Sequence, residues 1–495
     1  MRGDYKWEEG YVSGAVYYFN TDLIKLLTDV YTLASYTNPL HPDIFPGVCK
    51  MEAEVVRMTA NLFHGGPSSC GTMTTGGTES ILMACKAYRD YARSEWGIKH
   101  PEIILPTTSH PAFDKAGLYF GIRITHTPVD PVHYKADINA MRRAIGRNTI
   151  LLVGSTPNFP YGTMDDIEEI AALGRQYNIP VHVDACLGGF LVIFMEQAGY
   201  KLPPFDFSVP GVTSISADTH KYGFAPKGSS VILYSEPKYR HHQFCVTTDW
   251  PGGVYGSPTV NGSRAGGIIA ACWATMVSFG LNGYVDATKK IVETTKRIDK
   301  RLREIDGLFI FGSPATSVIA IGSKVFHIYR LSDALTTRGW NLNPLQYPEG
   351  PCSKLVDHYQ PSHSQIDPVP SLLTTINPLT PSWSDSVPSL LTTTSPLTPS
   401  RSDSVPSLLT TTSPLTPSQT LIHLCVTYMH TMNGVADRFI ADVEEEVALI
   451  MKDPGKEVDG KLAMYGMAQK IPDRSIVGDF TRFFLDSMYY TPANQ

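Results

Sequence analysis

The chain has no paired cysteine motif, no excess of basic residues and no long apolar run. Its 8 cysteines are scattered without a Cys-x-x-Cys spacing, so we expect neither a disulfide framework nor a metal site, and a reducing cytosolic setting fits best. The 41 basic residues are outnumbered by 47 acidic ones, giving a net charge of -6. This balance argues against nucleic acid as a partner.

Membrane and export signals are also missing from the sequence. No apolar run approaches the ~20 residues that span a bilayer, and polar and charged residues rather than a signal peptide follow Met1. We therefore expect this chain alone to be soluble, with any membrane attachment supplied by sequence that it does not contain.

A lysine lies in a loop between two β-rich runs, Val212–Ile215 and Ser229–Tyr234. This residue, Lys221, follows His220 and precedes Tyr222. A lysine that is partly desolvated at the end of a strand has a lowered pKa and can form a Schiff base. Taken alone, the pattern fits an ordinary solvated lysine as well.

A glycine pair and then an aspartate precede this lysine in the sequence. Asp184 ends an apolar strand that begins near Ile179, and a carboxylate at a strand's carboxyl end can hold a pyridine nitrogen protonated. Upstream, Gly76 and Gly77 open a helix whose first N–H groups can bind a phosphate. A glycine pair alone indicates no more than a helix start. A phosphate cradle, an aspartate and a lysine in this order predict a pyridoxal 5'-phosphate site.

Three other segments are candidates for the same site, each with a plain structural alternative. His110 lies between a predicted strand and helix, where it can stack on a planar cofactor or make a local hydrogen bond. Arg264 lies at a predicted helix start and suits a phosphate or an ordinary ion pair. The proline-rich segment 38–47 predicts a fixed extended path that lines a site, crosses a neighbouring subunit or merely links elements.

Helical and strand periodicities alternate from Met51 to Tyr234, which predicts a doubly wound α/β domain. We expect an N-terminal segment over residues 1–50 and a large α/β domain over 51–288. A smaller α+β C-terminal domain is expected from residues 289–348 and 421–495. The predicted strands are 102–105, 123–127, 149–153, 181–184, 213–216 and 229–234, and the predicted helices are 52–62, 78–94, 112–119, 138–145, 165–177 and 289–305.

A repeat tract rich in Ser, Thr and Pro interrupts the smaller domain over residues 349–420. The unit Val-Pro-Ser-Leu-Leu-Thr-Thr recurs at Val369, Val387 and Val405, a period of 18 residues by subtraction. Such a composition buries too little apolar surface to fold, so we expect the tract to be disordered. The flanking runs 341–347 and 421–427 are predicted to be two strands that pair as a hairpin.

With these residues in view, the sequence resembles the sphingosine-1-phosphate lyases, fold-type I pyridoxal phosphate enzymes related to the group II decarboxylases. The resemblance covers nearly all of residues 10–347 and 421–495. It departs from the family at Pro111, where alanine is usual, at the repeat tract, and in lacking the family's N-terminal membrane segment. The runs that carry it are Val12–Tyr17, Asn38–Gly47, Gly76–Tyr88, His182–Phe190, Ser214–Ser230 and Tyr465–Gln469.

The resemblance implies a retro-aldol cleavage of the C2–C3 bond of phosphorylated sphingoid bases, giving a long-chain aldehyde and phosphoethanolamine. It also implies a homodimer at the cytoplasmic side of the endoplasmic reticulum. Two alternatives stay open, an amino acid decarboxylase and an inactive scaffold disrupted by the repeat tract. The implied roles are as follows: Gly77, Thr78, His110, Asp184, His220 and Lys221 bind the cofactor; Lys227 and Arg264 bind the substrate phosphate; Lys221, His220 and Tyr255 are alternatives for the base.

Overall fold

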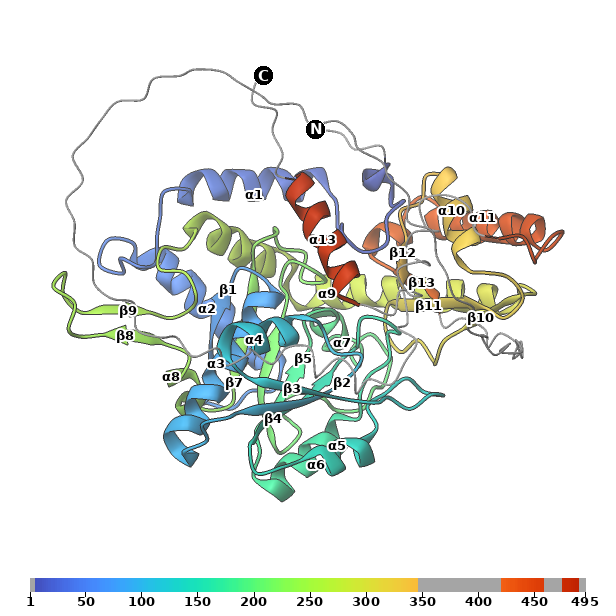
Figure 1. Cartoon of the computed structure of the whole chain (residues 1–495). Coiled ribbons are helices and arrows are strands. Elements are labelled where there is room, and N and C mark those ends of the chain that lie inside the picture. Colours follow the sequence, from blue (N-terminus) through green and yellow to red (C-terminus); the bar gives the residue numbers. More distant parts are fainter. Residues whose placement is uncertain (1–4, 346–419, 458–473, 489–495) are drawn as a thin grey trace, which may run out of the picture. The chain divides into compact units, whose positions relative to one another are not determined.

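The structure is a computed structural model that describes residues 5–345, 420–457 and 474–488 (Figure 1). The repeat tract falls outside the described residues except for Thr420, so its expected disorder stays a prediction. The run Tyr465–Gln469, which contributes to the family resemblance, also lies outside them.

A mixed seven-stranded sheet forms the core of the first 234 residues, with strand order β1-β7-β6-β5-β4-β2-β3. The five strands from β3 to β6 run parallel, and β7 and β1 close one edge in antiparallel register. All the strands predicted in this region are present, whereas β1 was not predicted. The strands are β1 (Cys70–Thr74), β2 (Glu102–Pro106), β3 (Arg123–Thr127), β4 (Thr149–Ser155), β5 (Val181–Asp184), β6 (Val212–Ala217) and β7 (Ser230–Tyr234).

Helices cover both faces of this sheet because alternate residues of each buried strand point to opposite sides. In β2, Ile103 and Leu105 pack with α3 and α4, whereas Ile104 packs into the core on the other face. This confirms the doubly wound α/β prediction. The helices of this region are α2 (Pro46–Leu62), α3 (Gly77–Trp96), α4 (Ala112–Phe120), α5 (Ile138–Ala144), α6 (Ile167–Tyr177), α7 (Gly189–Val192) and α8 (Pro237–His241).

The N-terminal segment contains two helical elements before its prolines. After η1 (Trp7–Glu9), Asn20 caps α1 (Thr21–Ala34), accepting hydrogen bonds from two backbone N–H groups of its first turn. The segment 38–47 is not extended throughout, since it forms turns and then enters α2 at Pro46. Proline is tolerated at the first position of a helix, where its missing N–H has no partner to lose.

A long helix, α9 (Gly266–Arg303), follows the hairpin of β8 (Cys245–Thr247) and β9 (Tyr255–Ser257). It begins near the helix start predicted at Arg264 and includes most of the predicted helix 289–305, and it is kinked at Gly280, whose backbone is not helical. Within the described ranges α9 is the one helix with the length and apolar composition of a membrane span. It packs against α1 and α2, and buried core helices meet the same criterion, so this is weak evidence for a span.

A second, antiparallel sheet has the strand order β10-β11-β13-β12. Its last pair confirms the predicted hairpin, with Asn343 opposite His423 and Leu345 opposite Leu421. The repeat tract therefore enters the chain at the connection between two paired strands. The elements are β10 (Leu308–Ile310), β11 (Val318–Ser323), α10 (Tyr329–Thr337), β12 (Asn343–Leu345), β13 (Leu421–Cys425), η4 (Tyr428–Thr431) and α11 (Val435–Ile450).

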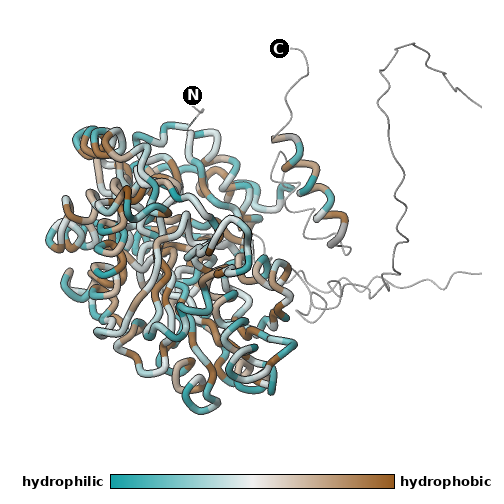
Figure 2. Tube along the Cα trace, turned by 90° about the vertical axis from the view of Figure 1, so that its left-hand side faces the viewer, coloured by the Kyte–Doolittle hydropathy of each residue, from teal (hydrophilic) through white to brown (hydrophobic). Residues whose placement is uncertain are grey.

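One more helix, α13 (Arg474–Met488), was not predicted from the sequence. Hydrophobic and hydrophilic residues alternate along it (Figure 2), and Phe480 and Phe483 are exposed.

Deleting residues 349–419 is expected to leave folding and activity unchanged or improved. Thr420 is buried beside β13 and is retained, so the new connection keeps 346–348 and Thr420, within the usual hairpin-loop length of about two to five residues. Closure entropy changes by only roughly 0.6 kcal/mol per doubling of loop length. Limited proteolysis, cofactor content and turnover of the deleted and full chains test this. Loss of folding or of substrate binding on deletion would show that the tract has a role.

Candidate active site

Lys221 forms an ion pair with a buried aspartate at the carboxyl end of β6. Its Nζ lies 2.9 Å from Oδ2 of Asp218, whose side chain is only 2% exposed. The strand β6 is hydrogen-bonded to β5 on one side and to β7 on the other, and this fixes the position of Asp218, which follows β6 directly. Oδ1 of Asp218 is buried and has no hydrogen-bond partner among the described residues. The sequence analysis did not single out Asp218.

This pair corrects the expected ionisation of the lysine. Burial works to lower the pKa of Lys221, but the charge and hydrogen bond of Asp218, with smaller contributions from Cys186 and Asp184, raise it above its ordinary value. The sequence analysis considered burial alone, which predicts a lowered pKa. Without the cofactor, Lys221 is therefore an ammonium ion rather than a free amine at neutral pH.

His220 lies between this ion pair and the next strand. Its Nδ1 donates a hydrogen bond to the carbonyl oxygen of Ser229, which leaves Nε2 facing Asp218 at 3.7 Å. Burial lowers the pKa of His220, more than Asp218 raises it. The ring is thus fixed and neutral at pH 7, with Nε2 as its basic nitrogen.

Asp184 lies at the carboxyl end of β5, next to β6, as predicted. Its Oδ1 accepts hydrogen bonds from the backbone N–H of Cys186 at 3.0 Å and from Ser216 Oγ at 3.4 Å. Ser216 Oγ in turn lies 3.1 Å from Nε2 of His182, whose Nδ1 contacts Ser214 Oγ. Burial lowers the pKa of His182 to about 4. A neutral network therefore orients the carboxylate of Asp184.

The glycine pair stands at the start of α3, with Gly76 as its N-cap and Gly77 as its first residue. Glu79 accepts hydrogen bonds from both the N–H and the hydroxyl of Thr75, at 2.7 and 2.6 Å. A Cβ on Gly77 would lie 2.8 Å from each carboxylate oxygen of Asp218 and 2.9 Å from Cys186 Sγ. Only glycine fits here. The loop is thereby held against the ion pair, while Thr78 is exposed at the helix N-terminus.

These residues fit pyridoxal phosphate. The N-terminus of α3 can bind the phosphate of this cofactor, Asp184 can pair with its ring nitrogen, and Lys221 can react with its aldehyde. Oδ1 of Asp218, beside Gly77, is a buried polar atom that has no hydrogen-bond partner among the described residues. Buried polar atoms of this kind are usually paired, so a bound group can supply the partner. His110 is exposed at the same edge of the sheet, after β2, and its Nδ1 accepts a hydrogen bond from the N–H of Ala112 at 3.1 Å.

Lys227 lies beside a cluster that the sequence analysis missed. Its Nζ is 5.0 Å from the ring centroid of Tyr17 and 3.4 Å from the carbonyl oxygen of His220. Tyr17 packs edge-on against Tyr222, whose hydroxyl lies 3.3 Å from Cys425 Sγ on β13. Tyr17 precedes Lys227 by 210 residues, so no local signal could place them together. The strand after the repeat tract thus borders the lysine loop.

Arg264 and Tyr255 contact residues outside the loop that contains Lys221. The guanidinium of Arg264 forms an ion pair with Glu52, and both side chains are 13% exposed. Glu52 therefore already compensates the positive charge of Arg264. This is the ion-pair alternative that the sequence left open. Tyr255 lies on the β8–β9 hairpin with its hydroxyl beside Gly262. Among the described residues the ion pair of Lys221 is with Asp218 and not with Tyr255.

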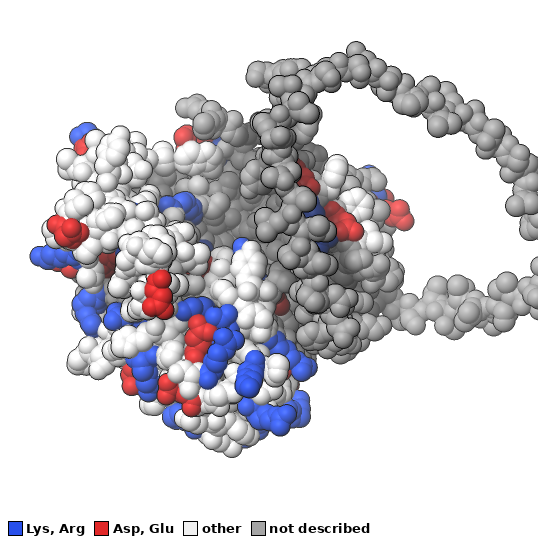
Figure 3. All heavy atoms as spheres, turned by 60° about the vertical axis from the view of Figure 1, so that its left-hand side comes forward, with Lys and Arg blue, Asp and Glu red and all other residues white. Residues whose placement is uncertain are grey.

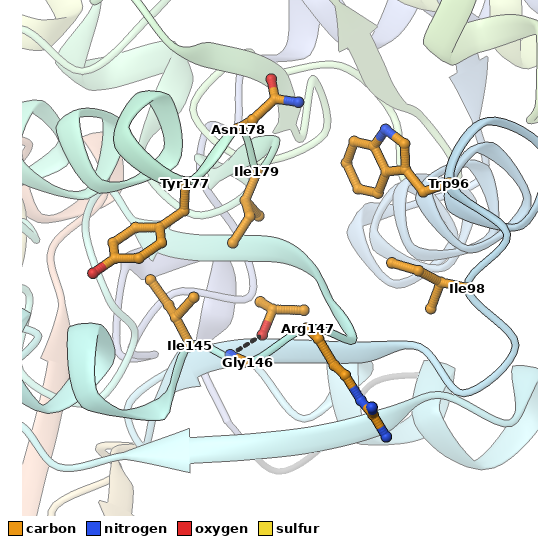
Figure 4. Close-up of a pocket in the computed structure, with 9 residues that line it drawn as sticks. Trp96, Ile98, Ile145, Gly146, Arg147, Tyr177, Asn178 and Ile179 are labelled. Carbon is orange, nitrogen blue, oxygen red and sulfur yellow. Dashed lines mark hydrogen bonds between the residues drawn. The ribbon is translucent and has the colours of Figure 1, made fainter.

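A cavity of about 520 Å³ lies elsewhere, at the amino ends of β4 and β5. Trp96, Ile145, Arg147 and Tyr177 are among its lining residues (Figure 4). Asp184, His220 and Lys221 lie at the opposite, carboxyl edge of the sheet. Within the part of the chain that the structure describes, no group of His, Cys, Asp and Glu side chains could hold a metal ion.

Comparisons with known proteins identify the family of this chain. The family model of the pyridoxal-dependent decarboxylase conserved domain matches residues 6–321. The sphingosine-1-phosphate lyase of Drosophila melanogaster is 60% identical over 100% of this chain and 77% of its own length, and the mouse sphingosine-1-phosphate lyase 1 is 48% identical over 99% and 74%.

Solved structures give the same result. That of a Burkholderia pseudomallei sphingosine-1-phosphate lyase is 35% identical, with a TM-score of 0.78 over 99% of this chain and 92% of that one. A Lactobacillus brevis glutamate decarboxylase, 19% identical with a TM-score of 0.67, shares the fold. The chain therefore belongs to the pyridoxal-dependent decarboxylase family and, within it, to the sphingosine-1-phosphate lyases.

Proposed function

We propose that this chain is a pyridoxal phosphate-dependent lyase that cleaves the C2–C3 bond of phosphorylated sphingoid bases. The products are a long-chain aldehyde and phosphoethanolamine. The observation that carries the proposal is the ion pair of Lys221 with buried Asp218 against Gly77, in a chain related to sphingosine-1-phosphate lyases over its whole length.

The chain's own residues have distinct parts in this reaction. Pyridoxal phosphate, when bound, accepts the electron pair released at C2 as the C2–C3 bond breaks. Lys221 would hold it covalently, Gly77 and Thr78 would bind its phosphate, and Asp184 would keep a proton on its ring nitrogen. The resemblance to the family gives His110 as the residue that would stack on the cofactor. The base that takes the proton from the C3 hydroxyl is His220, Tyr255 or Lys221.

His220 has the strongest structural support as the base. It is neutral because burial lowers its pKa, and its Nε2 is the nitrogen left to accept a proton. Tyr255 is less suitable because it lies on a separate hairpin.

We assign the substrate's phosphate to Lys227 in the first place, and to Arg264 in the second. Burial lowers the pKa of Lys227, and the positive charge of Lys221 lowers it further. A bound phosphate would therefore stabilise the charged form of Lys227. Arg264 already has a carboxylate partner in Glu52, so it would have to share or exchange that partner to bind a phosphate.

The substrate phosphate is expected to be required for cleavage. Measured with matched phosphorylated and dephosphorylated sphingoid bases, kcat/KM should fall at least about a hundredfold without the phosphate, because the cationic donors of the site then lack the anion that they bind. Lys227→Gln should remove most of that preference, and Arg264→Gln less of it. Equal cleavage of both substrates by the unmodified chain would show that the phosphate assignment is wrong.

We further propose that the enzyme is a homodimer at the cytoplasmic side of the endoplasmic reticulum. Leu33 and Tyr36, at the end of α1, are 87% and 96% exposed, and Val254 on the β8–β9 hairpin is 76% exposed. Figure 3 shows few charged side chains on the upper part of the face that comes forward, whereas Lys and Arg gather on its lower part. Exposed apolar side chains of this kind favour a protein partner. The proposed location rests on the resemblance to the family.

A further inference from the structure

We infer that Asp218 is a positioning residue that holds Lys221 as an ammonium ion whenever the lysine is not joined to the cofactor. The inference rests on the proposed function only in taking Lys221 as the residue that joins pyridoxal phosphate. The 2.9 Å contact between Oδ2 and Nζ carries it, together with the burial of the carboxylate, which is 2% exposed. A buried carboxylate of this kind requires a cation.

The geometry leaves Asp218 little freedom to find another cation. It follows β6 directly, and the loop of Gly77 packs against both of its oxygens. Nε2 of His220 lies farther away, at 3.7 Å, and belongs to a ring whose pKa burial lowers. Lys221 is thus the cation that compensates Asp218. The other titratable groups that influence this pair are Asp184, Cys186, Lys227, Tyr17 and Cys425.

Two chemical consequences follow for Lys221. To join the cofactor, its Nζ must first lose the ammonium proton to water. A carbon–nitrogen double bond then forms, and the aldehyde oxygen leaves as water with the two remaining protons of the amine. Once a substrate amine had displaced it, Lys221 would be a neutral amine beside Asp218 and would take a proton from water. It then acts as a proton donor and not as the base for the C3 hydroxyl, which leaves that role to another residue.

The test measures the titration of Lys221 in the chain freed of its cofactor. Trace labelling with acetic anhydride from pH 7 to 11, followed by peptide mapping, gives the pH midpoint at which each lysine becomes reactive. An ordinary lysine has a midpoint near 10.4. We expect Lys221 of the unmodified chain to have a higher midpoint. In Asp218→Asn the midpoint should fall by two units or more, because burial then acts without the carboxylate.

A second measurement uses the cofactor itself. The rate at which pyridoxal phosphate attaches, followed by absorbance, should rise about tenfold per pH unit near neutrality in the unmodified chain. In Asp218→Asn it should be at least tenfold faster at pH 7, and Asp218→Glu should restore the slower rate in part. Asp206→Asn is the matched control, since Asp206 is 3% exposed and pairs with His64 away from Lys221.

The inference is overturned by a midpoint of Lys221 below that of an ordinary lysine in the unmodified chain, a result that needs no variant to fold. It is also overturned by an unchanged midpoint in a folded Asp218→Asn. Neither readout uses a sphingoid base. Failure of the proposed function, seen as no cleavage of that substrate, is therefore a separate outcome.

Discussion

Replacing Lys221 with alanine should lower turnover by at least about four orders of magnitude, or roughly 5.5 kcal/mol of activation free energy. The chain then loses the amine that holds the cofactor covalently. Lys227 cannot take its place, because its Nζ lies over the ring of Tyr17 and against the backbone of His220. Borohydride reduction of the purified protein followed by peptide mapping should place the pyridoxyl group on Lys221.

Lys227→Ala is the matched control for this experiment. It should keep the pyridoxyl group on Lys221 after reduction while losing affinity for the substrate. A pyridoxyl group found on another lysine of the unmodified chain, or normal turnover in Lys221→Ala, would contradict the assignment.

Asp184→Asn should retain cofactor and lose roughly a thousandfold in kcat, about 4 kcal/mol. The amide oxygen can still accept the hydrogen bonds of Cys186 N–H and Ser216 Oγ. A neutral amide, however, cannot keep the cofactor's ring nitrogen protonated, so the electron sink is weakened. Steady-state kinetics and cofactor absorbance measure the two effects separately.

Asp165→Asn controls for the loss of a buried acid. Asp165 accepts hydrogen bonds from Ser155 N–H and Ala136 N–H, and burial raises its pKa to about 6. It is part of the fold on the β4–α6 connection, so this variant should keep most of its turnover. If Asp184→Asn is as active as Asp165→Asn, the electron sink is not set by Asp184.

The parallel strands and the residues at their carboxyl ends were predictable from the sequence. Buried strands such as β4 and β5 are short apolar runs, and Asp184 directly ends one of them. The hairpin of β12 and β13 was also predictable, although the repeat tract separates its strands. In these cases the residues that predict a strand are the same residues that form it.

The contacts around the lysine were not predictable, because they join segments that are distant in the sequence. Asp218 looked like a loop residue until the fold placed it against Gly77 and Lys221. Its charge reverses the expected direction of the pKa of Lys221. The cluster of Tyr17 and Cys425 likewise requires the N-terminal segment and β13 to meet at Tyr222.

The most direct test of the account is product analysis with a phosphorylated sphingoid base. The purified chain with pyridoxal phosphate should release long-chain aldehyde and phosphoethanolamine in equal amounts, and Lys221→Ala should release neither. Release of carbon dioxide from an amino acid, with no aldehyde from the sphingoid base, would identify a decarboxylase instead. No product from any substrate by a chain that binds the cofactor would indicate an inactive scaffold, and either result would contradict the account.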